Sequence, residues 1–233
     1  MQGFLSGRDW PSTVVFDLDG TLVDSAGDIA ASLNQLLAIK GLSPFPVGKV
    51  IDFIGNGISA LIERAFWARG CRPDADELSA LVSTFRTIYG GRLTKLTRTY
   101  AGVIELVSDL SSRGIVLGVC TNKEENLAQG IIDGLGLRDR FGVVVGGMPA
   151  RPRKPSPLPL LETISSLGAS PQDAIMVGDG AADVYCARNA GVAFVGVTFG
   201  YSRTPITRLG ARITIDSYSE FGAACESLRS ARL

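Results

Sequence analysis

The sequence predicts an α/β protein with a Rossmann-like parallel sheet, helices on both faces of the sheet, and an inserted all-helical cap domain. From about residue 100 to residue 197, helix-like segments alternate with short apolar runs. This alternation is typical of a parallel sheet that helices cover on both sides. An isolated apolar run at Thr13–Phe16 ends in a polar loop, and residues 25–91 after it show only helical spacing. We therefore expect those residues to interrupt the sheet domain.

Length and composition set the class of protein. A chain of 233 residues with 45% hydrophobic residues can form one large domain, or a core with a smaller insert. The 23 basic and 23 acidic residues cancel, which gives no electrostatic indication of nucleic acid or an anionic membrane as partner. The longest apolar runs have strand length, so no membrane-spanning helix is expected. Residues 1–11 lack the pattern of a secretory signal. We expect a cytoplasmic protein, monomeric or homodimeric.

Cysteine and histidine usage narrows the chemistry. The four cysteines are scattered without CxxC spacing, which is typical of reduced residues that pack in a cytosolic protein. The chain contains no histidine. This absence excludes Ser-His-Asp and Cys-His catalysis and the usual zinc sites. Acid–base chemistry must therefore come from carboxylates, lysines or a bound metal.

The expected elements follow in chain order. The first strand is Thr13–Phe16, and Gly41 closes a first helix over residues 28–40. Cap helices are predicted over residues 47–53, 58–68 and 76–89. Core helices are predicted over residues 103–112, 125–135, 157–167 and 182–190, alternating with strands over 115–120, 143–145, 174–177 and 193–197. The predicted division is a core of residues 1–24 plus 92–233 and a cap of residues 25–91.

Polar side chains follow the predicted strands at the point where each strand ends. Because the carboxyl ends of parallel strands line one crevice, we expect these side chains to meet there. The segments that deliver them are Asp17-Leu18-Asp19-Gly20-Thr21, Thr121-Asn122-Lys123, the Pro-rich loop with Lys154, and Gly178-Asp179-Gly180-Ala181-Ala182-Asp183.

This set of residues suits phosphate chemistry. Carboxylates from two strands form a hard oxygen site for Mg²⁺, while a lysine and a threonine hydroxyl suit phosphate oxygens. One carboxylate can act as nucleophile and another can transfer protons. Each feature alone has an ordinary structural interpretation. Paired aspartates cap turns, a loop lysine is often solvated, and Asp179 with Asp183 could simply favour the start of a helix. The combination of four segments indicates a function.

The run Phe16-Asp-Leu-Asp-Gly-Thr-Leu-Val-Asp-Ser25 resembles the first motif of the haloacid dehalogenase superfamily. Thr121, Lys154 with Pro155, and the Gly-Asp-xxx-Asp of residues 178–183 are similar to its second, third and fourth motifs, in order. The helical block resembles the inserted cap of that superfamily. Within it, the segments that look most like the phosphoglycolate phosphatase branch are Gly55-Asn56-Gly57, Thr121-Asn122-Lys123, Arg153-Lys154-Pro155 and Gly196-Val-Thr-Phe-Gly-Tyr201.

The resemblance implies a Mg²⁺-dependent phosphatase that acts through an aspartyl phosphate on a small phosphorylated metabolite. It implies Asp17 as nucleophile and metal ligand, and Asp19 as general acid/base with its main-chain carbonyl on the metal. It places Thr121, Asn122 and Lys154 on the phosphate. Asp179 binds Mg²⁺, and Asp183 supports Lys154 or the metal-bound waters.

Two departures from the superfamily pattern are present. Gly180 and Ala182 stand where serine and asparagine are common, which removes possible hydrogen bonds around the metal site. Ser156 stands where an aspartate is common.

A closing cap would limit the size of the substrate, which favours a short anionic ester such as 2-phosphoglycolate. The small-residue turn Gly55-Asn56-Gly57 lets main-chain N–H groups approach a substrate carboxylate. Arg64, in the following helix, could add charge at that end, although exposed helix arginines are more often solvated.

Several alternatives remain at this point. Gly55-Asn-Gly57-Ile-Ser-Ala60 fits a dinucleotide-binding pattern, which would indicate an oxidoreductase, but no strand–helix–strand unit surrounds it. A receiver-like signalling domain is disfavoured by the helical insert and by Asp19. Dehalogenation is disfavoured by Asp19, and phosphonate cleavage by the lack of a lysine in residues 55–60. A sugar-phosphate phosphatase or a phosphomutase would share the same core machinery.

Overall fold

The computed structural model describes residues 10–231, and its centre is a six-stranded parallel sheet in the order β5-β4-β1-β6-β7-β8. Thr13 in the central strand β1 pairs with Val116 of β4 on one side and with Ala174 of β6 on the other. The predicted parallel sheet is confirmed. The strands of the sheet are β1 (Thr13–Phe16), β4 (Val116–Glu124), β5 (Val143–Gly147), β6 (Ala174–Gly178), β7 (Ala193–Val197) and β8 (Thr214–Ile215).

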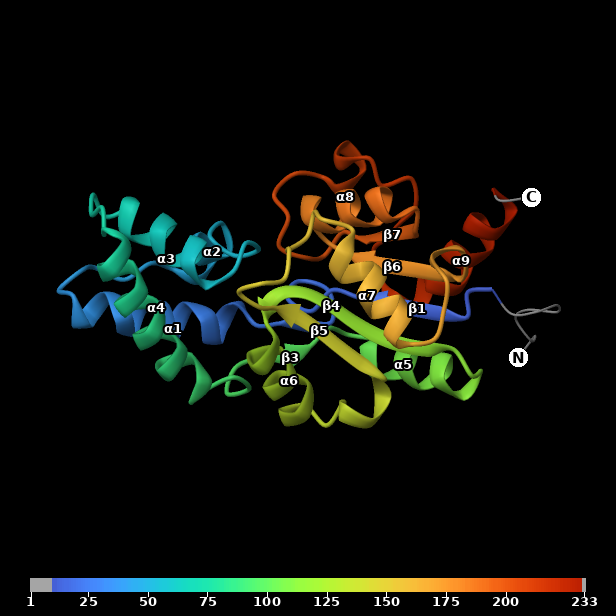
Figure 1. The fold of residues 1–233 in the computed structure, drawn as a ribbon, viewed down its shortest axis with the longest axis horizontal. Helices are drawn as coiled ribbons and strands as arrows, with labels where there is room; N and C mark the ends of the chain where they lie inside the picture. The colour runs from blue at the N-terminus through green and yellow to red at the C-terminus, as the bar shows by residue number, and fades with distance from the viewer. Residues whose placement is uncertain (1–9, 232–233) are drawn as a thin grey trace.

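Helices cover both faces of this sheet (Figure 1). Val14 and Phe16 point into one apolar cluster, and Val15 between them points into another, as expected for a strand buried on both sides. The helices of the first face are α5 (Val103–Ser112), α6 (Glu125–Gly134) and α9 (Phe221–Ser230), and those of the second are α7 (Leu158–Ser166) and α8 (Ala181–Ala190). Short 3-10 helices span Arg138–Arg140, Pro171–Asp173, Ile206–Leu209 and Tyr218–Glu220.

Four helices between residues 24 and 98 form a separate lobe, at the end of the sheet where the strands finish (Figure 1). They bury an apolar cluster of their own, which includes Leu33, Ile62 and Phe85. Asp74 caps the last of them by accepting a hydrogen bond from the main-chain N–H of Glu77 at 2.9 Å. The helices of this lobe, the cap, are α1 (Ala26–Ile39), α2 (Val47–Ile51), α3 (Ile58–Trp67) and α4 (Ala75–Gly90).

The two connections between core and cap lie side by side. They form an antiparallel ribbon of β2 (Val23–Asp24) and β3 (Arg98–Thr99). Our division into a core of residues 1–24 plus 92–233 and a cap of residues 25–91, which we retain as a proposal, places the first crossing at this ribbon. Residues 1–9 of that core lie outside the described residues.

The structure differs from the sequence prediction in the length of one strand and in several elements that are not predicted. The strand predicted over residues 115–120 continues to Glu124, so Thr121, Asn122 and Lys123 extend the strand instead of following it. The prediction ends at Cys120 because the apolar run that indicates the strand ends there. In the structure, a register shift between Cys120 and Glu124 interrupts the pairing with β5. β2, β3, β8 and α9 are not predicted from the sequence. No helix within residues 10–231 is both long enough and apolar enough to cross a membrane.

Candidate active site

A cavity of about 310 Å³ lies between the carboxyl ends of the central strands and the cap. Every core residue predicted for the site from the sequence lines it. These residues are Asp17, Asp19, Thr121, Asn122, Lys154, Asp179 and Asp183. The topology explains this meeting, since β1, β4 and β6 are neighbours in the sheet and end at the same edge.

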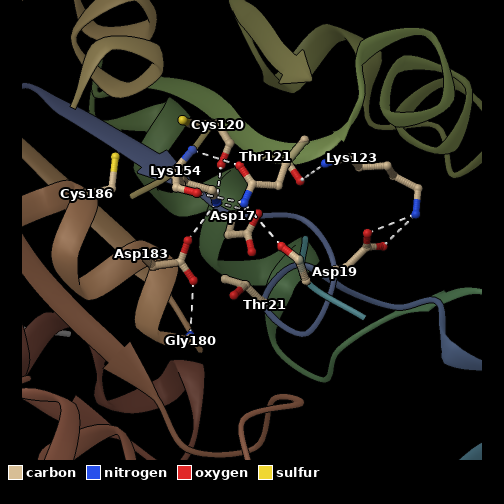
Figure 2. A network of polar contacts seen from close by, with 12 residues as sticks. Asp17, Asp19, Thr21, Cys120, Thr121, Lys123, Lys154, Gly180, Asp183 and Cys186 are labelled. Atoms are coloured by element: carbon tan, nitrogen blue, oxygen red, sulfur yellow. Dashed lines mark hydrogen bonds and ion pairs between the residues drawn. The ribbon is translucent and has the colours of Figure 1, made fainter. Parts of the chain in front are cut away.

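Lys154 is a buried cation between two carboxylates (Figure 2). Its Nζ lies 2.8 Å from Asp17 Oδ1 and 2.6 Å from Asp183 Oδ1, and it donates a hydrogen bond to the Cys120 carbonyl at 2.7 Å. Burial alone would lower the pKa of Lys154, but Asp17 and Asp183 raise it well above its usual value. The ammonium therefore stays charged, and removing one partner of such a buried pair typically costs about 3–5 kcal/mol.

Three carboxylates crowd around this single ammonium. Oxygen atoms of Asp17, Asp179 and Asp183 all lie within 4.8 Å of one another. Burial raises the pKa of Asp17 to about 6, although Lys154 opposes the shift. Burial, together with the charges of Asp183 and Asp17, raises the pKa of Asp179 to about 8. The cluster thus carries more negative charge than Lys154 neutralises, and an additional cation would relieve it.

The residues present fit a divalent metal ion. Asp17 Oδ1 is buried and has no hydrogen-bond partner among the described residues, because Lys154 approaches it at ion-pair distance but outside hydrogen-bond geometry. Such an oxygen can still bind a cation, and hard carboxylate oxygens are the ligands that Mg²⁺ prefers. The donor set of Asp17 and Asp179 therefore matches the predicted cofactor.

Asp179 is held in place from two sides. The main-chain N–H of Tyr201 donates to its Oδ2 at 2.7 Å, and the Thr21 hydroxyl donates to its Oδ1 at 3.4 Å. A Cβ at Gly200 would clash with the Cβ of Asp179, so only glycine fits at that position. The loop after β7 thus packs directly against this carboxylate.

Asp183 serves the core in two ways. One carboxylate oxygen binds Lys154, and the other accepts the Gly180 main-chain N–H at 3.1 Å at the start of α8. Gly180 stands where serine is common in the superfamily, but its main-chain N–H still orients the Asp183 carboxylate. Asp183 is nearly fully buried, and its ion pair with Lys154 compensates for the burial of its charge.

Asp19 lies on the cap side of Asp17. Its carboxylate accepts hydrogen bonds from Lys123 Nζ at 2.9 and 3.0 Å, and a further one from the Ser25 hydroxyl. Lys123 belongs to the segment Thr121-Asn122-Lys123 that the sequence places at this edge, but the sequence alone assigns it no role. The signal that points to it is its place in β4, two residues after Thr121, which puts its side chain at the same strand end.

Asn122 connects the core to the cap through its side chain. Its amide oxygen accepts the Lys154 main-chain N–H at 2.9 Å, and its amide nitrogen donates to the Lys154 and Gly55 carbonyls at 3.1 Å each. All three bonds join the Asn122 side-chain amide to main-chain atoms. Binding of phosphate by this side chain stays a prediction, while the observed contacts position the Lys154 loop.

The predicted cap residues divide into two groups. Gly55, Asn56 and Gly57 line the cavity, and the φ angles of +116° and +86° at the two glycines favour glycine there. Arg64 is not among the residues that line the cavity. Its guanidinium donates to the Phe53 carbonyl at 3.0 Å and so stabilises the turn between α2 and α3.

Ion pairs hold the cap against the core. Arg203, in the loop after β7, binds Asp52 at 2.5 Å and donates to the Gly48 carbonyl at 2.6 Å. Arg86 of α4 binds the Glu124 carboxylate through two N–H···O contacts, of 2.7 Å and 2.8 Å. The cap therefore lies over the acidic cluster in this structure.

Comparison with known proteins identifies the family. The model of the haloacid dehalogenase-like hydrolases matches residues 14–197. The chain belongs to this family. A phosphoglycolate phosphatase of Caulobacter vibrioides is 40% identical over 217 residues, which cover 93% of this chain and 92% of the relative. A phosphoglycolate phosphatase of Rhodospirillum rubrum is 41% identical over 216 residues, covering 91% and 90%.

Solved structures of haloacid dehalogenase-like proteins show the same fold. A crystal structure from Haemophilus somnus, described as a predicted phosphoglycolate phosphatase, superposes with a TM-score of 0.85 at 31% identity. The match covers 92% of this chain and 98% of that one. The expectation of a phosphatase is confirmed at the level of the family. The dinucleotide-binding alternative fails, because residues 55–57 lie in the turn between α2 and α3, so that a helix and not a strand leads into the glycine pattern.

Proposed function

We propose that this chain is a Mg²⁺-dependent phosphomonoester hydrolase that acts through an aspartyl phosphate on Asp17. The observation that carries the proposal is the buried, negatively charged cluster of Asp17, Asp179 and Asp183 around Lys154, at the bottom of a cavity that also holds Asp19. The side chains of Asp17 and Asp179, with the main-chain carbonyl of Asp19, would hold the metal. Bound there, Mg²⁺ would neutralise part of the phosphate charge and orient one phosphate oxygen.

The chain's own residues then divide the chemistry. The Asp17 carboxylate attacks phosphorus, the bond from phosphorus to the ester oxygen breaks, and Asp19 gives its proton to the departing alkoxide. Asp19, now a carboxylate, takes a proton from water as that water attacks the phosphorylated Asp17. The acyl phosphate bond breaks, and inorganic phosphate and the Asp17 carboxylate are regenerated. Lys154 and the Thr121 hydroxyl bind phosphate oxygens throughout.

For the substrate we propose 2-phosphoglycolate or a similarly small ester. The cavity of about 310 Å³ is small, and the cap contributes mainly apolar side chains to its wall. These are Ile29, Ile51, Ile54, Ile58, Leu61 and Phe85. Apolar walls leave the hydroxyls of a sugar without hydrogen-bond partners, and this argues against a sugar-phosphate phosphatase or phosphomutase. Relatives about 40% identical over most of their length are phosphoglycolate phosphatases.

A panel of phosphate esters tests this proposal. Phosphate release from 2-phosphoglycolate, hexose phosphates, pyrophosphate and p-nitrophenyl phosphate should be compared with Mg²⁺ present. We expect kcat/KM for 2-phosphoglycolate to exceed that for hexose phosphates and pyrophosphate at least about tenfold. A preference for sugar phosphates would instead support the alternative substrates. A cytoplasmic location and a monomeric or homodimeric state accompany this proposal.

A further inference from the structure

The hydroxyl of Tyr89, in the last turn of α4, is a buried polar group without a hydrogen-bond acceptor. Tyr89 is 1% exposed, and within the described residues its hydroxyl lies near the Lys123 ammonium but finds no acceptor for its own proton. The residue nevertheless lines the cavity. A buried hydroxyl left unsatisfied costs about 1–3 kcal/mol, and most buried polar groups are paired. A polar atom of a bound ligand would supply the missing partner.

Lys123 lies next to this tyrosine, across the boundary between core and cap. Its Nζ lies 4.8 Å from the centre of the Tyr89 ring and 2.9 Å from Asp19 Oδ2. The Lys123 side chain is 6% exposed and lines the cavity. Figure 2 shows it on the far side of Asp19 from Lys154 and Asp183. The cavity therefore has a positive charge at each side of the two reacting aspartates.

The other cations that line the cavity within residues 10–231 are already engaged. Lys154, held between two carboxylates, is the residue proposed for the phosphate oxygens, and Arg203 binds Asp52 and a main-chain carbonyl of the cap. Among the acidic groups of residues 10–231, Lys123 binds only Asp19. An ammonium carries three N–H donors, so Lys123 retains the capacity to bind a second acceptor.

We propose that Lys123 and Tyr89 form the subsite for a carboxylate that the substrate carries one carbon away from its ester oxygen. This inference rests on the proposed phosphatase function. Asp19 must contact the ester oxygen in order to protonate it, and a carboxylate one carbon away then lies beside Asp19, where Lys123 is. The ammonium binds this carboxylate, and the Tyr89 hydroxyl donates a hydrogen bond to it.

The subsite has one residue on each side of the cavity. Lys123 belongs to β4 of the core, and Tyr89 to α4 of the cap. A substrate carboxylate between them would bridge the two parts and favour the closed arrangement. An ester of the same length without the carboxylate lacks this bridge, so the pair discriminates by charge and not only by size.

A matched pair of substrates tests the subsite. 2-Phosphoglycolate and 2-hydroxyethyl phosphate have similar length, and only the first carries a carboxylate. The quantity to measure is the ratio of kcat/KM for the two esters in wild type, Tyr89→Phe, Lys123→Met and Lys123→Arg, with exposed Thr87→Ala in α4 as control. We expect the ratio to fall about tenfold in Tyr89→Phe and further in Lys123→Met. Lys123→Arg, which keeps the charge, should retain more of the ratio than Lys123→Met.

The outcomes separate this inference from the proposed function. Lys123→Met also removes the partner of Asp19, so its absolute rates fall for both esters, but only a carboxylate subsite changes their ratio. An unchanged ratio in both Tyr89→Phe and Lys123→Met overturns the subsite and leaves the phosphatase proposal intact. A wild-type preference for 2-hydroxyethyl phosphate also overturns it. Failure of the wild type to hydrolyse any ester, including p-nitrophenyl phosphate, contradicts the proposed function itself.

Discussion

The hydroxyl of Tyr201 donates a hydrogen bond to the Asp24 carboxylate at 2.8 Å, where the chain passes from core to cap. The same oxygen accepts the main-chain N–H groups of Ser25 and Ala26, at 2.7 and 2.9 Å, at the start of α1. The main-chain N–H of Tyr201 binds Asp179 Oδ2. A single residue thus contacts both the acidic cluster and the entrance to the cap.

Tyr201→Phe separates these two contacts. The substitution removes the hydroxyl and leaves the main-chain bond to Asp179. The Ser25 N–H then loses its acceptor, and the Ala26 N–H keeps only the Asp24 carboxylate, at 3.2 Å. We expect the free energy of unfolding to fall by about 1–3 kcal/mol, measured by urea denaturation. The Mg²⁺ concentration for half-maximal activity should change less than about twofold, since a twofold change corresponds to only a few tenths of a kcal/mol. A large change in that concentration without loss of stability would show that the hydroxyl acts on the metal site.

Removal of metal should abolish turnover. Asp17 and Asp179 provide carboxylate oxygens, and the chain offers no histidine to bind zinc. We expect EDTA to stop phosphate release and Mg²⁺ to restore it. Ca²⁺ should support little turnover, because its longer and more variable coordination misplaces the nucleophile. Full activity in metal-free buffer contradicts the proposed cofactor.

The pH dependence of stability should report the crowded carboxylates. The pKa of Asp179 is raised to about 8 and that of Asp17 to about 6, from ordinary values of 3.8. A group with a raised pKa in the folded state stabilises the fold at low pH, and this contribution is lost as pH rises through the folded value. The melting temperature of the metal-free protein should therefore fall between about pH 4 and pH 8 from this contribution.

Two controls identify the source of that slope. Asp179→Asn removes the most strongly shifted carboxyl, so the decline in melting temperature with pH should become shallower. Saturating Mg²⁺ should raise the melting temperature most at the upper end of the range, where the carboxylates are ionised. An identical slope in wild type and Asp179→Asn would assign the effect to other groups.

Substitutions of the two aspartates in the loop after β1 should reduce activity at different steps. Asp17→Asn removes the nucleophile, so neither phosphoenzyme nor turnover should be detectable by rapid quench and phosphate release. Asp19→Asn removes proton transfer, and we expect turnover of 2-phosphoglycolate to slow about 10²–10⁴-fold. For p-nitrophenyl phosphate, Asp19→Asn should slow the first chemical step less, since the nitrophenolate leaving group needs no proton. Near-normal turnover by Asp17→Asn would exclude the aspartyl-phosphate mechanism.

Much of the site is predictable because it depends on one rule of topology. Apolar runs alternating with helices indicate a parallel sheet, and parallel strands end at one edge. The sequence therefore predicts that Asp17, Lys154 and Asp179 lie together. The two-residue strands of the ribbon and β8 were not predictable, because two residues show no periodicity. Their pairing depends on neighbours that are distant in the sequence.

The sequence by itself determined the fold class, the acidic cluster and the reaction type that this cluster supports. Only the tertiary structure decided the direction of individual side chains. Arg64 follows the Gly55-Asn56-Gly57 turn by seven residues, yet its guanidinium donates to the Phe53 carbonyl and does not line the cavity. Lys123 and Tyr89 come from different parts of the chain and meet only when α4 lies against β4. Helical or strand spacing specifies a face, whereas contact across the boundary between two parts depends on how they pack together.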